Sequence, residues 1–297
     1  MRTLDRGASW VGLPAPVVPL GQASTSTGAA VWGIRFANPQ VGFVFGNGLW
    51  ETTDGGQRWT AVASPQGSIL DLEVIDSQVL ALTASGGSAQ AGTLWRQPLS
   101  GGAWQAVTQV SGPHTIATQG QVAAVLDGSS VIVTGNGGLS IATHALPCTT
   151  PAVGTPTAAA VTSPDGLALL CAGGAAMGSV EKTVYVSSDL GATWAKAGTA
   201  PLGGDPIGIS AANPDQLVVA AASGASELYY SGNGGASWTT AYYVGDGGAG
   251  FNDLGFTTTS DGVVVHGPAI SDPNSEGRPG QLLLTSDGGA AWQVVSF

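Results

Sequence analysis

Carboxylates and aromatic rings gather in the stretch "YYVGDGGAGFND" (242–253). Tyr243 could stack on a sugar ring, and Asp246 and Asp253 could bind its hydroxyls. Paired carboxylates also serve as acid and base in glycoside hydrolysis, which makes Asp205, Asp246 and Asp253 the catalytic candidates. The alternative is a glycine-rich loop whose aspartates face water. No residue is assigned as catalytic on this evidence.

Two further segments carry binding candidates, Glu181 in 172–182 and Arg278 in "ISDPNSEGRP" (270–279). Asp272, Asn274 and Glu276 of the second segment do not have the spacing of a calcium loop, so a solvated loop is favoured. The histidines, at 114, 144 and 266, show no metal-ligand spacing. We predict neither a metal nor a cofactor.

Cys148 and Cys171 lie 23 residues apart, which matches no zinc or redox motif. Two interpretations stay open. A disulfide would suit an exported protein, and two buried thiols are equally compatible with the spacing.

The charge balance restricts the partners. The 297 residues include 8 Lys and Arg against 19 Asp and Glu, a net charge of −11. Such a chain repels phosphate backbones and anionic membrane surfaces, which disfavours nucleic acid as a partner. No stretch reaches the ~18 apolar residues of a membrane span, and the first ten residues lack the apolar core of a signal peptide. A protein or a polysaccharide is the expected partner.

An octet recurs along the chain as "TTDGGQRW" (52–59), "SSDLGATW" (187–194), "SGNGGASW" (231–238) and "TSDGGAAW" (285–292). Looser copies occupy 3–10 and 134–141, and a degenerate one occupies 97–104. The mean spacing is about 47 residues. A repeat of this length indicates one supersecondary unit copied in tandem.

Each octet has the composition of a turn. An acid or amide at the third position can bind backbone amides, a glycine at the fifth permits positive φ, and a tryptophan at the eighth can bury its ring. Residues scattered over seven turns cannot share one catalytic act, so we predict a structural role. The residues in question are Asp5, Trp10, Asp54, Trp59, Asn136, Asp189, Trp194, Asn233, Trp238, Asp287 and Trp292.

Short alternating apolar runs flank the octets, which gives four strands per repeat with the octet between the third and fourth. With 47 Gly and 17 Pro, long helices are disfavoured. Tandem four-stranded units predict an all-β fold, a β-propeller of antiparallel blades. Residues 28–297 hold six complete repeats, and residues 1–27 hold an octet without inner strands. We expect one domain over 1–297, seven-bladed with blade strands lost upstream of Met1; the alternative is six blades with an N-terminal hairpin.

The octets resemble those of the Asp-box propellers, or bacterial neuraminidase repeats, a family that includes sialidases, xyloglucan-active glycosidases, sortilin-type receptors and photosystem II assembly factors. The resemblance covers essentially the whole chain and implies the fold. It also implies that the octets lie on the face opposite the ligand site. That places ligand contacts in the segments 62–68, 108–114, 144–158, 197–206 and 242–252, and in 84–92, 172–182 and 267–280.

The activities that the resemblance implies fit this chain unevenly. A sialidase needs three converging arginines, and only Arg35 lies on an inner strand. Xyloglucan-active relatives generally use two propellers, whereas the photosystem factors carry an arginine patch that this chain cannot supply. We therefore expect a non-catalytic scaffold that binds a protein or glycan through its loop face. The alternative is a glycoside hydrolase of the xyloglucanase or sialidase type, and a purely structural module is a third option. We expect an extracellular or cell-envelope location, with no signal present in this chain.

Overall fold

The computed structural model describes residues 1–5, 7–18, 30–85, 88–112, 115–148, 154–267 and 280–295. In these ranges every regular element is a β-strand, and the strands form six four-stranded antiparallel sheets. They also divide into two compact units. Unit 1 is Met1–Asp127 with Thr134–Ile141, and unit 2 is Gly128–Val133 with Ala142–Ser296.

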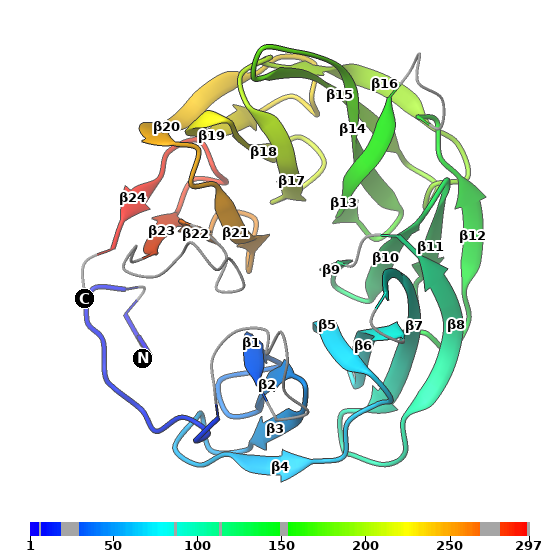
Figure 1. The fold of residues 1–297 in the computed structure, drawn as a ribbon, viewed down its shortest axis with the longest axis vertical. Coiled ribbons are helices and arrows are strands. Elements are labelled where there is room, and N and C mark those ends of the chain that lie inside the picture. Colours follow the sequence, from blue (N-terminus) through cyan, green and yellow to red (C-terminus); the bar gives the residue numbers. More distant parts are fainter. Residues whose placement is uncertain are drawn as a thin grey trace. The chain divides into compact units, whose positions relative to one another are not determined.

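Unit 1 contains two complete sheets and one further strand pair (Figure 1). The strands are β1 (Val31–Phe36), β2 (Gly42–Gly46), β3 (Leu49–Thr52), β4 (Thr60–Val62), β5 (Ser68–Ile75), β6 (Gln78–Ser85), β7 (Ser88–Pro98), β8 (Gln105–Ser111), β9 (Ile116–Gln119) and β10 (Val122–Asp127).

Unit 2 contains the remaining pair of the third sheet and three complete sheets, green to red in Figure 1. The strands are β11 (Ser130–Thr134), β12 (Ala142–Ala145), β13 (Thr155–Ser163), β14 (Gly166–Ala176), β15 (Ser179–Ser187), β16 (Ala195–Ala200), β17 (Asp205–Ala211), β18 (Leu217–Ala222), β19 (Gly224–Ser231), β20 (Thr239–Gly247), β21 (Phe251–Phe256), β22 (Gly262–His266), β23 (Gln281–Thr285) and β24 (Gln293–Val294).

Within each sheet the strands are neighbours in chain order. Every predicted octet except the N-terminal one joins the third strand of a sheet to the fourth, as at 187–194 between β15 and β16. In such a meander the first and third turns lie at one end of the sheet, whereas the second turn and the connection to the next sheet lie at the other. The octets therefore occupy one end of each sheet, and the predicted ligand loops the opposite end.

Six octets share one hydrogen-bond pattern. The hydroxyl at position one accepts the N–H of the position-five glycine at 2.8–3.0 Å. The same hydroxyl donates to Oδ1 at position three, also at 2.8–3.0 Å. That oxygen accepts the N–H of position seven at 2.8–3.0 Å. These octets begin at Thr3, Thr52, Thr134, Ser187, Ser231 and Thr285. The acids and amides predicted to be structural thus bind the turn itself.

The position-five glycine has a positive φ, as in Gly191 (88°) and Gly289 (98°). It also presses on the preceding sheet. A Cβ on Gly191 would lie 3.1 Å from Val131 of β11, and one on Gly289 would overlap Val218 of β18. In these octets the same glycine therefore fixes both the turn and the approach of two sheets.

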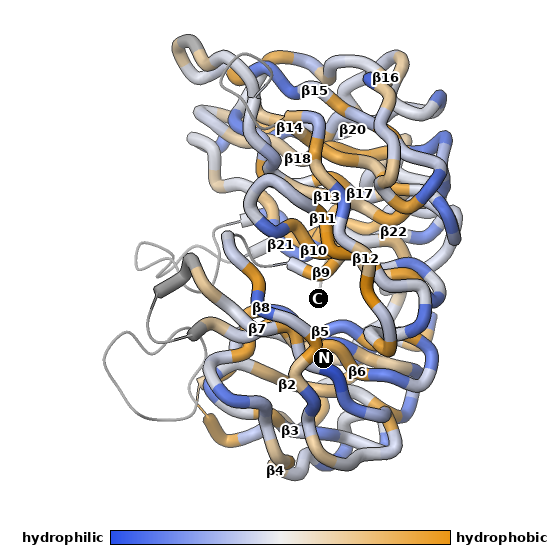
Figure 2. Tube along the Cα trace, turned by 90° about the vertical axis from the view of Figure 1, so that its right-hand side faces the viewer, coloured by the Kyte–Doolittle hydropathy of each residue, from blue (hydrophilic) through white to orange (hydrophobic). Residues whose placement is uncertain are grey.

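Octet tryptophans extend this packing. Trp238 packs against a buried cluster that includes Val184 of β15 and Tyr229 of β19, and Trp292 is buried in the cluster between the last two sheets. Their indole N–H groups donate to the glycine carbonyl three residues earlier. In Figure 2 the hydrophobic colour follows the strands and the hydrophilic colour gathers in turns. The core of each unit thus lies between facing sheets.

The preference for seven blades is wrong for the described residues, and the six-bladed alternative agrees with the six sheets. The described residues 1–5 and 7–18 contain the hydrogen bonds of an octet but no strand; they contain one isolated bridge, Arg2 with Val11. This segment covers the next octet instead. Leu13 lies against Gly56, and the Trp59 indole donates to the Pro14 carbonyl at 3.2 Å. The segment takes the place of a preceding sheet at that octet.

Cys148 and Cys171 form a disulfide. Cys148 follows β12, Cys171 lies on β14, and both are completely buried. Of the two interpretations that the sequence left open, the structure supports the disulfide.

Candidate functional site

The described binding candidates lie in unit 2, but mostly on strands rather than in loops. Glu181 is on β15, Tyr243 and Asp246 are on β20, and Asp253 is on β21. Asp205 begins β17. The prediction of loops at 172–182 and 242–252 was wrong, because strand pairing continues to Ala176↔Ser179 and to Gly224↔Gly247. Arg278, like Asp272 and Glu276, lies outside the described residues.

Asp246 is the centre of a buried polar network at the β20–β21 connection. Its carboxylate accepts the hydroxyl of Ser226 at 2.9 and 3.1 Å and the N–H of Gly248 at 2.9 Å. His266 Nε2 lies 2.7 Å from Oδ2. Burial raises the pKa of Asp246, but the bonds from His266, Gly248 and Ser226 outweigh it and lower that pKa below its usual range.

Ser226, His266 and Asp246 are the residue types of a catalytic triad, but their arrangement differs. In a triad the histidine accepts the serine proton; here both Ser226 and His266 contact the aspartate. Ser226 is completely buried, and its oxygen accepts the Gly250 N–H at 2.9 Å. The network therefore fixes the connection 247–250 and leaves Asp246 no free oxygen for substrate chemistry.

A second network fixes the connection between β16 and β17. Lys182 is completely buried and donates to the carbonyls of Val180, Leu202 and Gly204 at 2.7–2.9 Å. Burial lowers the pKa of Lys182 to about 8, against the raising effects of Glu227 and Asp205. Through these hydrogen bonds the Lys182 ammonium group holds residues 202–204 in place.

Exposed apolar side chains lie around the two connections that these networks fix, residues 202–204 and 247–250. We call Met177, Leu202, Ile207 and Tyr243 the loop patch; their exposed fractions are 105%, 57%, 40% and 64%. Met177 is in the β14–β15 turn and has a positive φ of 49°. Glycines dominate the neighbouring backbone, so little covers these side chains.

Contacts within unit 2 place the members of the loop patch at the same end of neighbouring sheets. The Val180 N–H donates to the Leu202 carbonyl at 3.1 Å, and Ser179 bridges Gly204, which brings the turn of Met177 beside Leu202. A Cβ on Gly250 would lie 3.3 Å from Ile207. Tyr243 pairs with Glu227, so both point to one face, and Glu227 lies against Gly203 and Gly204. The four exposed apolar side chains of the loop patch therefore lie at the sheet ends opposite the octets.

The three catalytic candidates have different surroundings. Asp246 belongs to its network, Asp205 pairs with Ala222 at the start of β17, and Asp253 has a positive φ of 53° within β21.

Unit 1 holds a carboxylate pair that the sequence did not single out. On β5, Glu73 accepts from Arg35 Nε at 2.7 Å and from the Thr118 hydroxyl at 3.4 Å. Asp71 accepts the Ile116 N–H at 2.8 Å and lies 3.7 Å from Arg35. Burial raises the pKa of Glu73 to about 7, against the lowering effect of Arg35. These bonds join the first strands of three sheets, β1, β5 and β9.

Among the described residues, no group of three or more His, Cys, Asp or Glu side chains is arranged to hold a metal ion. In the same part of the chain, no helix has the length and apolar character needed to cross a membrane.

Comparisons with known proteins separate fold from function. No family model matches the chain, and no curated protein matches its sequence. YCF48 bound to D1 peptide is a structural match at TM-score 0.54 and 16% identity, covering 89% of this chain and 80% of that one. YCF48 from Cyanidioschyzon merolae matches at TM-score 0.58 and 15% identity, covering 89% and 84%. The fold is a β-propeller.

The GH74 xyloglucanase from Xanthomonas campestris is a further β-propeller match, with TM-score 0.56 and 13% identity. The match covers 89% of this chain but 45% of the xyloglucanase. These TM-scores establish that the fold is shared. At identities of 13–16%, the function has to be argued from the site itself.

Proposed function

We propose that this protein is a non-catalytic β-propeller that binds a protein partner through the loop patch of unit 2. The observation that carries the proposal is the difference between the polar and the apolar side chains of this surface. The polar groups of Asp246, Ser226 and Lys182 are used inside the protein, whereas the large apolar groups point outward. Large exposed apolar side chains that gather at one end of a scaffold are typical of protein-binding surfaces.

Two further observations support this choice over a glycoside hydrolase. The catalytic candidates Asp205, Asp246 and Asp253 lie on three different strands, β17, β20 and β21, and Asp246 is held by three hydrogen-bond partners. One YCF48 structure contains a bound peptide, so a propeller of this kind can hold a protein segment. The glycan partner and the hydrolase remain as outcomes of the test below.

We further propose an extracellular or cell-envelope location. The buried Cys148–Cys171 disulfide supports it, because structural disulfides persist in oxidising compartments.

The test compares partner capture by variants of the purified protein. Leu202→Ser with Tyr243→Ser replaces two exposed apolar groups of the loop patch, so folding is retained. We expect at least a tenfold loss of the captured protein, measured by quantitative mass spectrometry. The matched control is Val17→Ser with Leu139→Ser, two exposed apolar residues of unit 1.

Equal capture by the loop-patch variant and the wild type would contradict the proposal. So would turnover of a xyloglucan or sialoside substrate that Asp205→Asn or Asp253→Asn abolishes, because that result would identify a hydrolase. Retention of a soluble polysaccharide, lost in the Tyr243 variant, would assign the surface to a glycan.

A further inference from the structure

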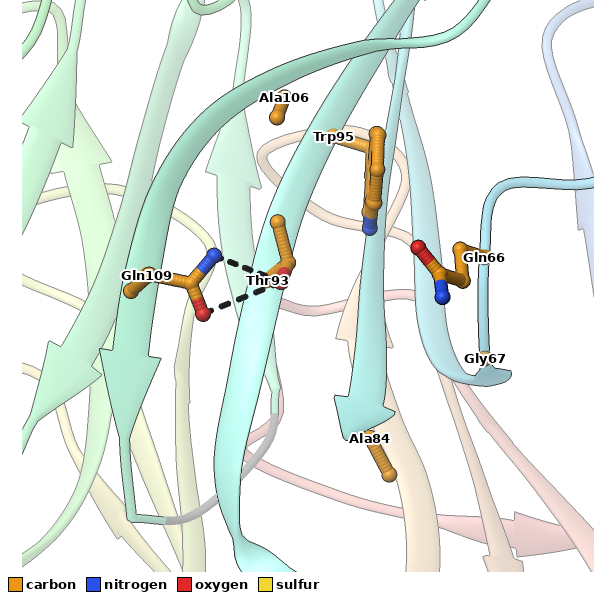
Figure 3. A pocket seen from close by; sticks show the side chains of 7 residues that line it. All are labelled: Gln66, Gly67, Ala84, Thr93, Trp95, Ala106 and Gln109. Atoms are coloured by element: carbon orange, nitrogen blue, oxygen red, sulfur yellow. Dashed lines mark hydrogen bonds between the residues drawn. The ribbon is translucent and has the colours of Figure 1, made fainter. Parts of the chain in front are cut away.

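A cleft of about 540 Å³ lies on the second sheet of unit 1 (Figure 3). The residues that line it lie on β6, β7 and β8 and in the segment just before β5. They are Gln66, Gly67, Ala84, Thr93, Trp95, Ala106 and Gln109. The volume falls in the range of small-molecule sites, roughly 300–1,000 Å³. The cleft belongs to unit 1, so it is separate from the loop patch and from the proposed function.

Trp95 supplies a fixed aromatic wall. Part of its ring packs on the cluster that contains Phe45, Leu72 and Ala81, and its indole N–H donates to the Thr83 hydroxyl at 2.9 Å. The side chain is only half-buried, and Figure 3 shows its ring between Gln66 on one side and Thr93 and Gln109 on the other. The indole thus keeps its orientation without a ligand, which reduces the entropy cost of stacking.

The polar groups around this wall are neutral. Thr93 Oγ1 and Gln109 contact each other at 3.1 and 3.3 Å, as the dashed lines of Figure 3 show. Gln66 and Gln109 are exposed, so their amides have donors and acceptors available. None of the described residues that line the cleft has an ionisable side chain.

We propose that this cleft binds one neutral pyranose unit of a glycan, stacked on Trp95 and hydrogen-bonded by the amides of Gln66 and Gln109. A sugar presents an apolar C–H face for the indole and hydroxyls for the amides. The uncharged lining disfavours anionic sugars, because nothing there would compensate a desolvated carboxylate.

The test is a titration of the ¹⁵N-labelled full chain with cellotetraose, and with tetragalacturonate as the anionic probe. The chain has nine tryptophans, and Trp95→Phe identifies the Trp95 indole signal by its loss. We expect cellotetraose to shift that signal and the Gln66 and Gln109 side-chain amides, with tetragalacturonate having no effect. We expect binding in the millimolar range.

Gln109→Ala and Ala106→Leu test the cleft from two sides, and both positions are exposed, so folding is retained. We expect each to weaken cellotetraose binding at least tenfold. Gln40→Ala, an exposed glutamine elsewhere in unit 1, is the matched control. Unshifted Trp95 and glutamine signals at saturating cellotetraose would overturn the proposal, as would shifts caused equally by tetragalacturonate or only by a proline-rich peptide. None of these results bears on partner capture by the loop patch.

Discussion

At the level of single residues, the octets show why aspartate and asparagine alternate at position three. The turn uses one oxygen, Oδ1, which both residue types possess. The other terminal atom of the side chain bonds the hydroxyl at position seven in either role. Asp189 Oδ2 accepts the Thr193 hydroxyl at 2.6 Å, whereas Asn233 Nδ2 donates to Ser237 Oγ at 2.9 Å. The exchange therefore preserves every backbone bond of the turn.

Position one is less tolerant. Ser187 Oγ accepts the buried N–H of Gly191 at 2.8 Å and donates to Asp189 at 2.8 Å. Ser187→Ala leaves that N–H without a partner, so we expect the free energy of unfolding to fall by roughly 1–3 kcal/mol. Urea denaturation measures the change, with the exposed Ser188→Ala as control. Equal midpoints for the two variants would contradict this role.

The octet aspartates also predict an acid response. The Thr193 hydroxyl, followed by the Thr193 N–H and Ser187, lowers the pKa of Asp189 from 3.8 to about 2. A lowered folded-state pKa contributes stability above pH 3.8 that disappears as the pH falls through about 2. Asp189→Asn should flatten this part of the stability curve, measured by thermal melts between the two values. Identical acid profiles for wild type and variant would disprove the assignment.

At the level of elements, four octets also join neighbouring sheets through their glycines, Gly138, Gly191, Gly235 and Gly289. Gly289→Ala would force a Cβ onto Val218 and would strain a φ of 98°. We expect a loss of at least ~2 kcal/mol in unfolding free energy, from backbone strain and overpacking together. Gly208→Ala is the control, because nothing lies within 4 Å of its Cβ position and no positive φ is involved. Similar melting temperatures for the two variants would show that the octet is not an inter-sheet contact.

The sequence predicted those elements whose information is local. Alternating strands, the octet turns and their place between third and fourth strands all follow from neighbouring residues, and the structure confirms them. The sequence did not predict that Asp246 contacts Ser226 and His266, because those contacts join three different strands, β20, β19 and β22. In "SILDLEVI" the alternation of Asp71 and Glu73 was a usable signal, but it does not reveal that Arg35 lies opposite.

The Glu73 cluster gives the strands of unit 1 a pH dependence. Burial raises the pKa of Glu73 from 4.5 to about 7. A raised folded-state pKa contributes stability that is complete below pH 4.5 and is lost as the pH rises through about 7. Glu73→Gln keeps an acceptor oxygen for Arg35 Nε and removes the titration, so we expect the unfolding free energy of the variant to change less over this range.

Chemical denaturation at several pH values measures that slope, with Glu51→Gln as the control for loss of one negative charge. A steeper slope in Glu73→Gln than in the wild type would contradict the assignment.

At the level of the whole molecule, the described residues repeat one unit, a four-stranded antiparallel sheet, six times. A four-stranded sheet cannot bury both of its faces alone, so each sheet packs on a neighbour within its unit, through clusters such as the one around Val184, Leu217 and Tyr229. The octet turns fix those pairs at one end, which leaves the other end open to carry the loop patch. The octet turns and the surface of the proposed function therefore lie at opposite ends of the sheets.

The Cys148–Cys171 disulfide adds a constraint of a different kind. It closes a loop with a sequence separation of 23 between the exit of β12 and β14. Closing such a loop restricts the unfolded chain, so Cys148→Ala with Cys171→Ala should lower the unfolding free energy by ~3 kcal/mol. Guanidinium denaturation measures the loss, and since both sulfurs are buried, a mild reductant should reproduce it only after unfolding. If the double variant were as stable as the wild type, the bond would be incidental to the fold, and its support for an oxidising compartment would fall with it.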